Sequence, residues 1–139
     1  MAMPFHTTRR VEFVDTDTAC IVHFSNFFRF MEAAEMELLR SLGLSVALTW
    51  EGQKLGFPRV SASCDYMRPA RFEDLLDVTV TISNIGRKSV TYAFEFSRGG
   101  ETLARGQVST VCCRVLAEHK LESIEIPPGI RAKLEEAAG

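Results

Sequence analysis

The chain has 139 residues, of which 46% are hydrophobic and 24% charged, with a formal net charge of −2 and an isoelectric point of about 5.9. This length predicts a single domain over residues 1–139, with a core large enough to need no metal or disulfide for its stability. A nucleic-acid binder normally carries a basic excess, so the slight acidity argues against that class of partner. The first ten residues lack the apolar segment of a signal peptide, and no apolar run reaches the ~20 residues of a membrane helix.

The four cysteines are Cys20, Cys64, Cys112 and Cys113, and they form no C-x-x-C pair. On an extended strand the adjacent Cys112 and Cys113 would point to opposite faces. A zinc site or a disulfide framework is therefore not expected, and reduced thiols are typical of a cytoplasmic protein. The sequence thus predicts a cytoplasmic protein that binds neither nucleic acid nor membranes.

The first predicted elements are a short strand over residues 7–14 and a helix from about residue 24 to residue 42. Apolar residues recur at helical spacing over this second segment and cover most of its surface, so we expect the helix to be buried on most sides. Gly43 is the kind of residue that ends a helix, and Ser25 or Asn26 is a candidate for its N-terminal cap. The polar side is narrow and consists of Arg29, Glu32, Glu35 and Arg40.

The second half of the chain alternates apolar and polar residues, which predicts antiparallel strands between about residues 57 and 126. Turns are expected at residues 85–87 and 98–101, where glycine interrupts the alternation. The segment 43–58 is expected to be a loop, and residues 129–139 a short amphipathic helix.

This order of elements predicts an α+β fold in which one antiparallel sheet of about five or six strands wraps around the single long helix. A sheet must bury its apolar face, and the long helix is the only large element available to cover it. The back of such a sheet and its free edges stay exposed, which predicts association of the chain with itself.

The segment DTDTACIVHFSNFFRFMEAA, residues 15–34, places two aspartates directly before the helix. Asp15 and Asp17 either support a turn or take part in chemistry. In this combination of acids, small apolar residues and an aromatic helix, the chain resembles the hotdog-fold acyl-CoA thioesterases, most closely the 4-hydroxybenzoyl-CoA thioesterase family. Two weaker similarities are YMRPARFEDLL at residues 66–76 and GRKS at residues 86–89.

The resemblance implies that Asp17 is the catalytic carboxylate, acting as a nucleophile or as the general base for water. Backbone N–H groups near His23 and Phe24, at the positive end of the helix, would then stabilise the oxyanion. Asp15 is expected to be a turn residue. His23 is either a catalytic side chain that orients water or substrate, or a partly buried histidine with its hydrogen bonds satisfied.

The resemblance also places the nucleotide end of coenzyme A at a group of three residues, Arg87, Lys88 and Ser89. The alternative for this group is a solvated turn. Arg and Lys suit the phosphates of coenzyme A because their hydrogen bonds to phosphate are charge-assisted. Arg68 and Arg71 are weaker candidates for the same contact.

The function that the resemblance implies is hydrolysis of an aromatic or a short-chain to medium-chain acyl-CoA, by a homodimer that pairs into a dimer of dimers. No metal and no cofactor are expected, since coenzyme A is part of the substrate. The alternatives are a hotdog protein that binds acyl-CoA or acyl carrier protein without hydrolysis, and a 3-hydroxyacyl dehydratase. A haloacid-dehalogenase phosphatase also carries paired aspartates, but it needs a parallel sheet with crossover helices.

Overall fold

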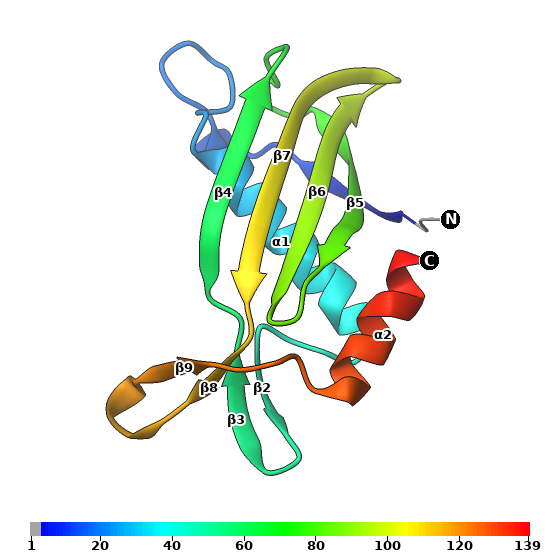
Figure 1. The fold of residues 1–139 in the computed structure, drawn as a ribbon. Coiled ribbons are helices and arrows are strands. Elements are labelled where there is room, and N and C mark those ends of the chain that lie inside the picture. The colour runs from blue at the N-terminus through cyan, green and yellow to red at the C-terminus, as the bar shows by residue number, and fades with distance from the viewer. Residues whose placement is uncertain (1–3) are drawn as a thin grey trace.

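The computed structural model describes residues 4–139, and Figure 1 shows how its strands and helices are arranged. The strands are β1 (Phe5–Arg10), β2 (Ala47–Trp50), β3 (Gln53–Gly56), β4 (Arg59–Tyr66), β5 (Leu75–Ile85), β6 (Ser89–Arg98), β7 (Glu101–Val111), β8 (Cys113–Val115) and β9 (Leu121–Ser123). The helices are α1 (Asn26–Ser41) and α2 (Pro128–Ala138). Across residues 4–139, neither helix has the length and apolar character needed to cross a membrane.

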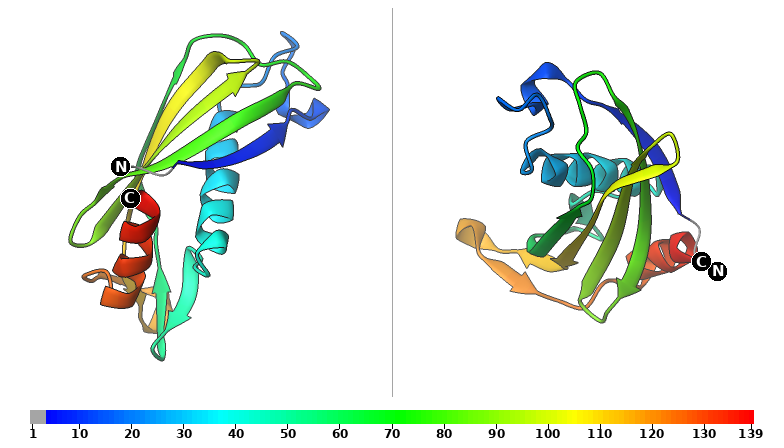
Figure 2. Two further views of the ribbon diagram at one scale, coloured as in Figure 1. Left: turned by 90° about the vertical axis from the view of Figure 1, so that its right-hand side faces the viewer. Right: turned by 90° about the horizontal axis from the view of Figure 1, so that it is seen from above.

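The main sheet has five strands in the order β1-β5-β6-β7-β4, and every neighbouring pair is antiparallel. Figure 2 shows that this sheet curves and that α1 runs along its concave face. The core lies between them and combines the buried face of α1 with the inward residues of the middle strands. Its members include Phe27, Phe30, Met31, Ala34, Val78, Val80, Phe94 and Phe96.

Helix α1 ends as the sequence suggests but begins differently. Gly43 has a positive φ of 73°, and the Leu44 N–H donates to the Leu39 carbonyl at 2.8 Å, which closes the last turn. At the N-terminus neither predicted cap forms, because both side chains bond elsewhere. Ser25 Oγ contacts the His23 ring and Asn26 Nδ2 donates to the Asp15 carbonyl. The first amides of α1 are therefore not satisfied by a side chain of this turn.

The single sheet expected from the sequence is divided into two. Strands β2, β3, β8 and β9 form a separate sheet in the order β2-β3-β8-β9. The predicted long return strand breaks at Cys112, whose N–H donates to the Lys88 carbonyl at 2.7 Å instead of continuing the ladder. Cys112 and Cys113, on either side of this break, are both buried.

The segment 47–56 forms the β2–β3 hairpin where a loop was expected. Glu51 and Gly52, at the tip, have positive φ values of 48° and 79°. Two successive left-handed residues are typical of the tight turn that joins antiparallel strands. The signal in the sequence is weak because the strands have only four residues each and are mostly exposed.

The N-terminal strand also differs, since β1 ends at Arg10 and residues 13–15 form a 3-10 turn. The Glu12 N–H donates to Asp15 Oδ2 at 2.8 Å, which bends the chain before the predicted strand is complete. Phe13 and Val14 consequently point outward, with exposed fractions of 78% and 76%. This bend directs the chain from β1 toward the start of α1.

The two hairpins of the main sheet turn where the glycines predict. Strands β5 and β6 are joined at residues 86–88, and β6 and β7 at Gly99 and Gly100. Helix α2 supports the first of these turns, because Arg131 Nη2 donates to the Gly86 carbonyl at 2.5 Å and to the Arg87 carbonyl at 3.2 Å. Helix α2 therefore stabilises the turn at residues 86–88 through these hydrogen bonds to its carbonyl groups.

Gly106 allows α1 and the sheet to approach closely. A Cβ atom at this position would lie 2.2 Å from Met31 Cε and 3.1 Å from the Ser63 carbonyl oxygen. We expect Gly106→Val to destabilise the fold by about 2 kcal/mol, the usual cost of overpacking a core. Urea unfolding measures this cost, which should be smaller when Gly106→Val is introduced into a Met31→Ala background than into the wild type. An equal cost in both backgrounds would show that the Met31 contact is not the cause.

Candidate active site

Asp17 lies in a tight loop between the 3-10 turn and α1. Its Oδ1 accepts the Ala19 N–H at 2.8 Å, and its carbonyl accepts the Cys20 N–H at 2.9 Å. Cys20 has a φ of 63°, a conformation that suits glycine better than cysteine. Within residues 4–139, Asp17 makes no ion pair and Oδ2 accepts no hydrogen bond. One oxygen of the Asp17 carboxylate thus holds the loop, and the other is free for chemistry.

Asp15 has a structural role and holds this loop closed. The residue is buried, and its Oδ2 accepts the Glu12 N–H. Its carbonyl accepts two further donors from the start of α1, the His23 N–H at 2.9 Å and Asn26 Nδ2 at 2.8 Å. The chain therefore enters and leaves the loop that carries Asp17, residues 16–22, at one carbonyl oxygen.

The backbone amides before α1 are not equivalent. The His23 N–H is occupied by the Asp15 carbonyl, so it is unsuited to hold an oxyanion. The Phe24 N–H has no acceptor within residues 4–139. The peptide that carries this N–H is polarised from its other end, because the His23 carbonyl accepts the Asn26 N–H at 2.9 Å. Of the two amides proposed from the sequence, only that of Phe24 is available.

The His23 side chain is held by its neighbours. Its Nδ1 lies 2.7 Å from Ser25 Oγ and 3.3 Å from the Ser25 amide nitrogen. The imidazole packs on the Phe24 ring with 4.6 Å between the ring centroids. These contacts engage Nδ1 and leave Nε2 without a partner in the described chain, so the ring is only half satisfied and its role stays open between the two predictions.

A pocket of about 500 Å³ opens beside this loop and the start of α1. Its wall combines the free Asp17 carboxylate with aromatic and apolar side chains from β4 and the loop that follows it. The lining residues are Asp17, Ile21, Val22, Phe24, Phe27, Tyr66, Met67, Arg68, Pro69 and Ala70. The structure thus brings Asp17 and Phe24 to one pocket, whereas His23 is not among its lining residues.

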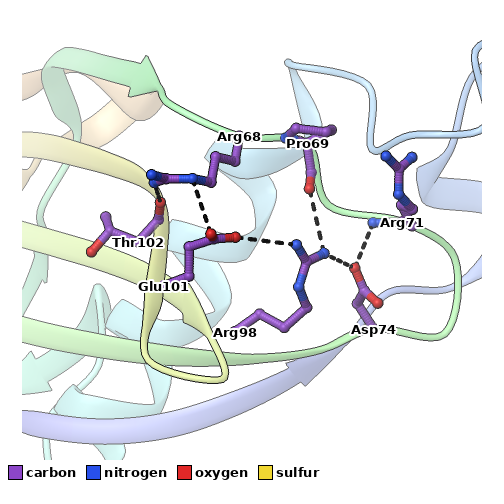
Figure 3. A network of polar contacts seen from close by, with 7 residues as sticks. All are labelled: Arg68, Pro69, Arg71, Asp74, Arg98, Glu101 and Thr102. Atoms are coloured by element: carbon purple, nitrogen blue, oxygen red, sulfur yellow. Dashed lines mark hydrogen bonds and ion pairs between the residues drawn. The ribbon is translucent and has the colours of Figure 1, made fainter.

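A polar network beside the pocket fixes the loop after β4, and Figure 3 shows its contacts. Arg68 Nε pairs with Glu101 at 3.2 Å, and Arg98 Nη1 pairs with Asp74 at 2.5 Å. Burial alone would raise the pKa of Asp74, but the Arg71 N–H and the Arg98 guanidinium outweigh burial and lower it. Arg68 thus already has a carboxylate partner, although this pair is half-exposed and Glu101 also contacts Arg98 Nη2 at 3.6 Å.

Arg87, Lys88 and Ser89 lie far from Asp17 in the same chain. They occupy the turn at the start of β6, whereas the pocket adjoins the other end of that strand, where Arg98 Nη1 contacts the Pro69 carbonyl at 3.4 Å. The ten residues of β6 separate the two ends by about 30 Å. Arg87 pairs with Glu125 at 3.4 Å and Lys88 Nζ lies 3.5 Å from Ser123 Oγ. One chain alone does not join these three residues to the pocket.

The sequence interpretation placed Glu35 on the polar side of the helix, which is wrong. Glu35 is 1% exposed and pairs with Arg59 at 2.6 Å, while its Oε2 has no hydrogen-bond partner. Burial raises the pKa of Glu35, and the hydrogen bond from Arg59 only partly offsets this rise. The sequence spacing did indicate that Glu35 is buried, because it follows the buried Phe27 and Met31 at intervals of four residues and so lies on the same face of the helix.

A second pocket, of about 250 Å³, adjoins this pair between α1 and β4. Its lining residues are Phe28, Glu32, Glu35, Arg59, Ala62 and Val108. Within residues 4–139, no group of three or more His, Cys, Asp or Glu side chains is placed to hold a metal ion. The first pocket differs from this second one in that its lining includes Asp17 and Phe24, the residue whose N–H has no acceptor within residues 4–139.

Comparison with known proteins shows the family to which the chain belongs. The sequence model of the thioesterase superfamily matches residues 20–105, more than half of the chain. The chain belongs to the thioesterase superfamily. Its reaction class is accordingly thioester hydrolysis. The match begins after Asp17, so the role of that residue depends on the geometry of its loop rather than on the superfamily match.

Individual thioesterases resemble the chain over most of its length. The 4-hydroxybenzoyl-CoA thioesterase of Pseudomonas sp. strain CBS-3 is 31% identical, with 91% of this chain and 94% of the relative covered. An acyl-CoA thioesterase of Haemophilus influenzae is 26% identical, with 88% of each chain covered. The crystal structure of a 1,4-dihydroxy-2-naphthoyl-CoA thioesterase from Synechocystis superposes with a TM-score of 0.84 at 29% identity, over 96% of this chain and 97% of that one. The chain thus has the hotdog fold of these thioesterases.

Proposed function

We propose that the chain hydrolyses acyl-CoA thioesters, with Asp17 as the catalytic carboxylate. One observation carries this proposal: the free oxygen of Asp17 and the unpaired Phe24 N–H belong to residues that line the same pocket. A thioester carbonyl needs an attacking oxygen on its carbon and a hydrogen-bond donor at its oxygen. The N-terminus of α1 adds the positive end of a helix dipole on the side where the oxyanion develops.

The reaction begins with the thioester carbonyl oxygen at the Phe24 N–H. Asp17 removes a proton from water as the water oxygen bonds to the carbonyl carbon, and the carbonyl π electrons move to the oxygen. The tetrahedral intermediate then collapses: the carbonyl re-forms and the carbon–sulfur bond breaks. The departing thiolate takes the proton that Asp17 holds and becomes the free thiol of coenzyme A. Direct attack by Asp17 would instead form an acyl-aspartyl anhydride, which water hydrolyses to the same products.

The acyl group is proposed to be aromatic, or a short to medium chain. The pocket wall near Asp17 is rich in flat and apolar side chains, contributed by Phe24, Phe27, Tyr66 and Met67. Aromatic acyl-CoA substrates appear in the names of the Pseudomonas and Synechocystis relatives, and these names support an aryl group for this chain.

The carrier end of the substrate is proposed to reach a second copy of the chain. Arg87, Lys88 and Ser89 lie at the far end of the sheet from Asp17, so one chain does not form the whole site. Strand β4 is an edge strand of the main sheet, and such an edge pairs readily with another copy. A homodimer formed at this edge, and a dimer of dimers built from it, would allow these residues of one copy to serve the pocket of the other.

The non-hydrolytic binder and the dehydratase are less well supported. A carboxylate locked in a buried ion pair would have favoured a binding protein, but Asp17 has no ion pair within the described chain. The His23 ring, which a dehydratase would need at the pocket, packs on Phe24 and bonds to Ser25. The geometry therefore favours hydrolysis.

The proposal is tested with a panel of acyl-CoAs that includes aryl groups and C2 to C16 chains, by measuring the release of free thiol without added metal. We expect turnover with at least one member, and the preferred acyl group identifies the substrate class. Sedimentation of the same protein across a concentration series reports whether activity follows a dimer. Binding of coenzyme A without turnover on any member of the panel would instead support the non-hydrolytic binder.

A further inference from the structure

Tyr66 connects the sheet to the turn that carries the oxyanion amide. It is the last residue of β4 and lines the pocket beside Asp17. Its hydroxyl donates to the Phe24 carbonyl at 3.0 Å. Its ring packs edge to face against Phe27 at 5.5 Å and Phe24 at 6.4 Å between centroids. Tyr66 therefore contacts the same residue whose N–H is free to bind substrate.

We propose that Tyr66 is a positioning residue, whose hydroxyl fixes the Phe24 carbonyl so that the Phe24 N–H is held toward the thioester oxygen. This inference rests on the proposed function, since it assigns a support to the oxyanion donor of that reaction. Tyr66 acts through Phe24 and contacts neither the attacking oxygen nor the leaving sulfur.

The turn at Phe24 needs such a support because the helix start is weakly restrained. The N-cap Ser25 provides no side-chain cap to α1. The Phe24 carbonyl receives one backbone donor, the Phe27 N–H, at a long distance of 3.4 Å. The hydrogen bond from the Tyr66 hydroxyl is shorter than the one from the Phe27 N–H. Its donor belongs to the main sheet rather than to the turn itself. An oxyanion donor must be placed within a few tenths of an ångström of its target to be effective.

Other restraints act on the chain that precedes the peptide group carrying the Phe24 N–H. The His23 N–H and Asn26 Nδ2 both donate to the Asp15 carbonyl, and they fix the chain before Phe24. Tyr66 fixes the chain after the Phe24 N–H. The amide is thus held from both sides, by the catalytic loop and by the sheet.

Tyr66 keeps its proton throughout the working range of the enzyme. Burial, followed by the adjacent Cys64, raises the pKa of Tyr66 to about 12. The hydroxyl therefore stays a neutral donor at any pH below about 10. Replacing Tyr66 should change the rate without changing the shape of the pH–rate profile, which separates positioning from acid–base catalysis.

The first test compares Tyr66→Phe with wild type in single-turnover and steady-state assays. We expect kcat to fall about fivefold to tenfold, the effect of losing one hydrogen bond of ordinary strength, while KM stays within about twofold. Tyr92→Phe is the matched control, since it removes a buried hydroxyl that has no partner in the described chain. A lower melting temperature with unchanged kcat in Tyr66→Phe would reduce Tyr66 to a structural role and overturn the inference.

The second test observes the oxyanion contact directly. Asp17→Asn should bind substrate without hydrolysing it, so the carbonyl stretch of the bound thioester becomes measurable by isotope-edited infrared spectroscopy. A hydrogen bond from the Phe24 N–H lowers that frequency, and adding Tyr66→Phe should make the lowering smaller. An equal frequency in both backgrounds would contradict the inference.

The two proposals fail in distinguishable ways. If Asp17→Asn keeps full activity, the proposed function is wrong in its catalytic residue, whatever Tyr66 does. If Asp17→Asn abolishes turnover and Tyr66→Phe keeps both kcat and the carbonyl frequency, the proposed function stands and Tyr66 has no positioning role.

Discussion

Asp17→Asn should lower kcat by about a thousandfold, within the range expected when a general base or nucleophile is removed. The asparagine retains an oxygen that can accept the Ala19 N–H, so the loop keeps the hydrogen bond that Asp17 Oδ1 makes. What is lost is the negative charge and the second carboxylate oxygen, which accepts no hydrogen bond within residues 4–139. Thiol release with the preferred acyl-CoA measures the effect.

The control for this variant is Asp77→Asn, the same chemical change at an exposed position of β5. It should leave kcat within about twofold of wild type, as for surface substitutions in general. Binding of coenzyme A and the unfolding midpoint should be unchanged in both variants. A thousandfold loss in Asp17→Asn accompanied by unfolding would not support catalysis, and a loss below tenfold would exclude Asp17 as the catalytic carboxylate.

Arg59→Met should destabilise the fold by about 3 kcal/mol at pH 8, because it leaves a buried carboxylate without its partner. This value is at the lower end for a broken buried pair, since the Arg59 side chain is 30% exposed whereas that of Glu35 is 1% exposed. In the wild type Glu35 Oε1 has one partner and Oε2 has none. The variant removes the single charge-assisted hydrogen bond that stabilises the ionised form of Glu35 in its buried position.

The loss in Arg59→Met should depend on pH in a defined direction. Burial raises the folded-state pKa of Glu35 above its ordinary value, so its contribution to stability is fully present below the unfolded-state pKa and is lost as pH rises through the folded-state pKa. Removing Arg59 raises the folded-state pKa further. The gap in unfolding free energy between wild type and variant should therefore shrink as the pH falls and Glu35 takes up a proton.

Urea unfolding at several pH values measures this gap. Glu35→Leu combined with Arg59→Met is the matched control, because replacing both members of a buried pair by apolar residues is often neutral or stabilising. The double variant should be more stable than Arg59→Met alone and should lose the pH dependence. A destabilisation that is equal at pH 5 and pH 8 would show that Arg59 acts through packing rather than through its charge.

The part of the fold that could be read from the sequence is the part with long, regular periodicity. The helical recurrence of apolar residues fixed the position of α1 within two residues at its start, and Gly43 indicated where it ends. The paired glycines at 99 and 100 located a hairpin because their positive φ values suit its turn. Such signals are local, so no tertiary information is needed to interpret them.

The missed features depend on specific contacts that the periodicity does not show. Strand β1 ends early because of a local one, in which the Glu12 N–H donates to Asp15 Oδ2 and bends the chain. The long return strand ends at Cys112 because the Lys88 carbonyl, which lies in a distant segment, accepts the Cys112 N–H. Glu35 was predicted to face solvent because acidic side chains are usually exposed. It is buried because it pairs with Arg59, which lies in a different element, β4. Pairings of this kind join residues far apart in the chain, and a single sequence does not display them.

In the candidate site, too, some features could be predicted from the sequence and others required the structure. Asp17 and Phe24 were identified from the motif, and the structure places both at one pocket. The choice between the amides of His23 and Phe24 required the hydrogen bond from His23 to Asp15. Tyr66 belongs to a segment that the sequence analysis singled out, residues 66–76. The role of its hydroxyl could not be predicted, because that role depends on the hydrogen bond to the Phe24 carbonyl.

The double acceptance at the Asp15 carbonyl makes the catalytic loop a closed ring. The chain leaves this oxygen after Asp15 and returns to it at His23 and Asn26, so residues 16–22 form a loop fastened at both ends. A substitution among residues 16–22 can move the Asp17 carboxylate while His23 and Asn26 stay bonded to the Asp15 carbonyl, so that the Phe24 N–H between them keeps its place. Under the proposed roles, the attacking group could then change in evolution while the oxyanion donor stays in place.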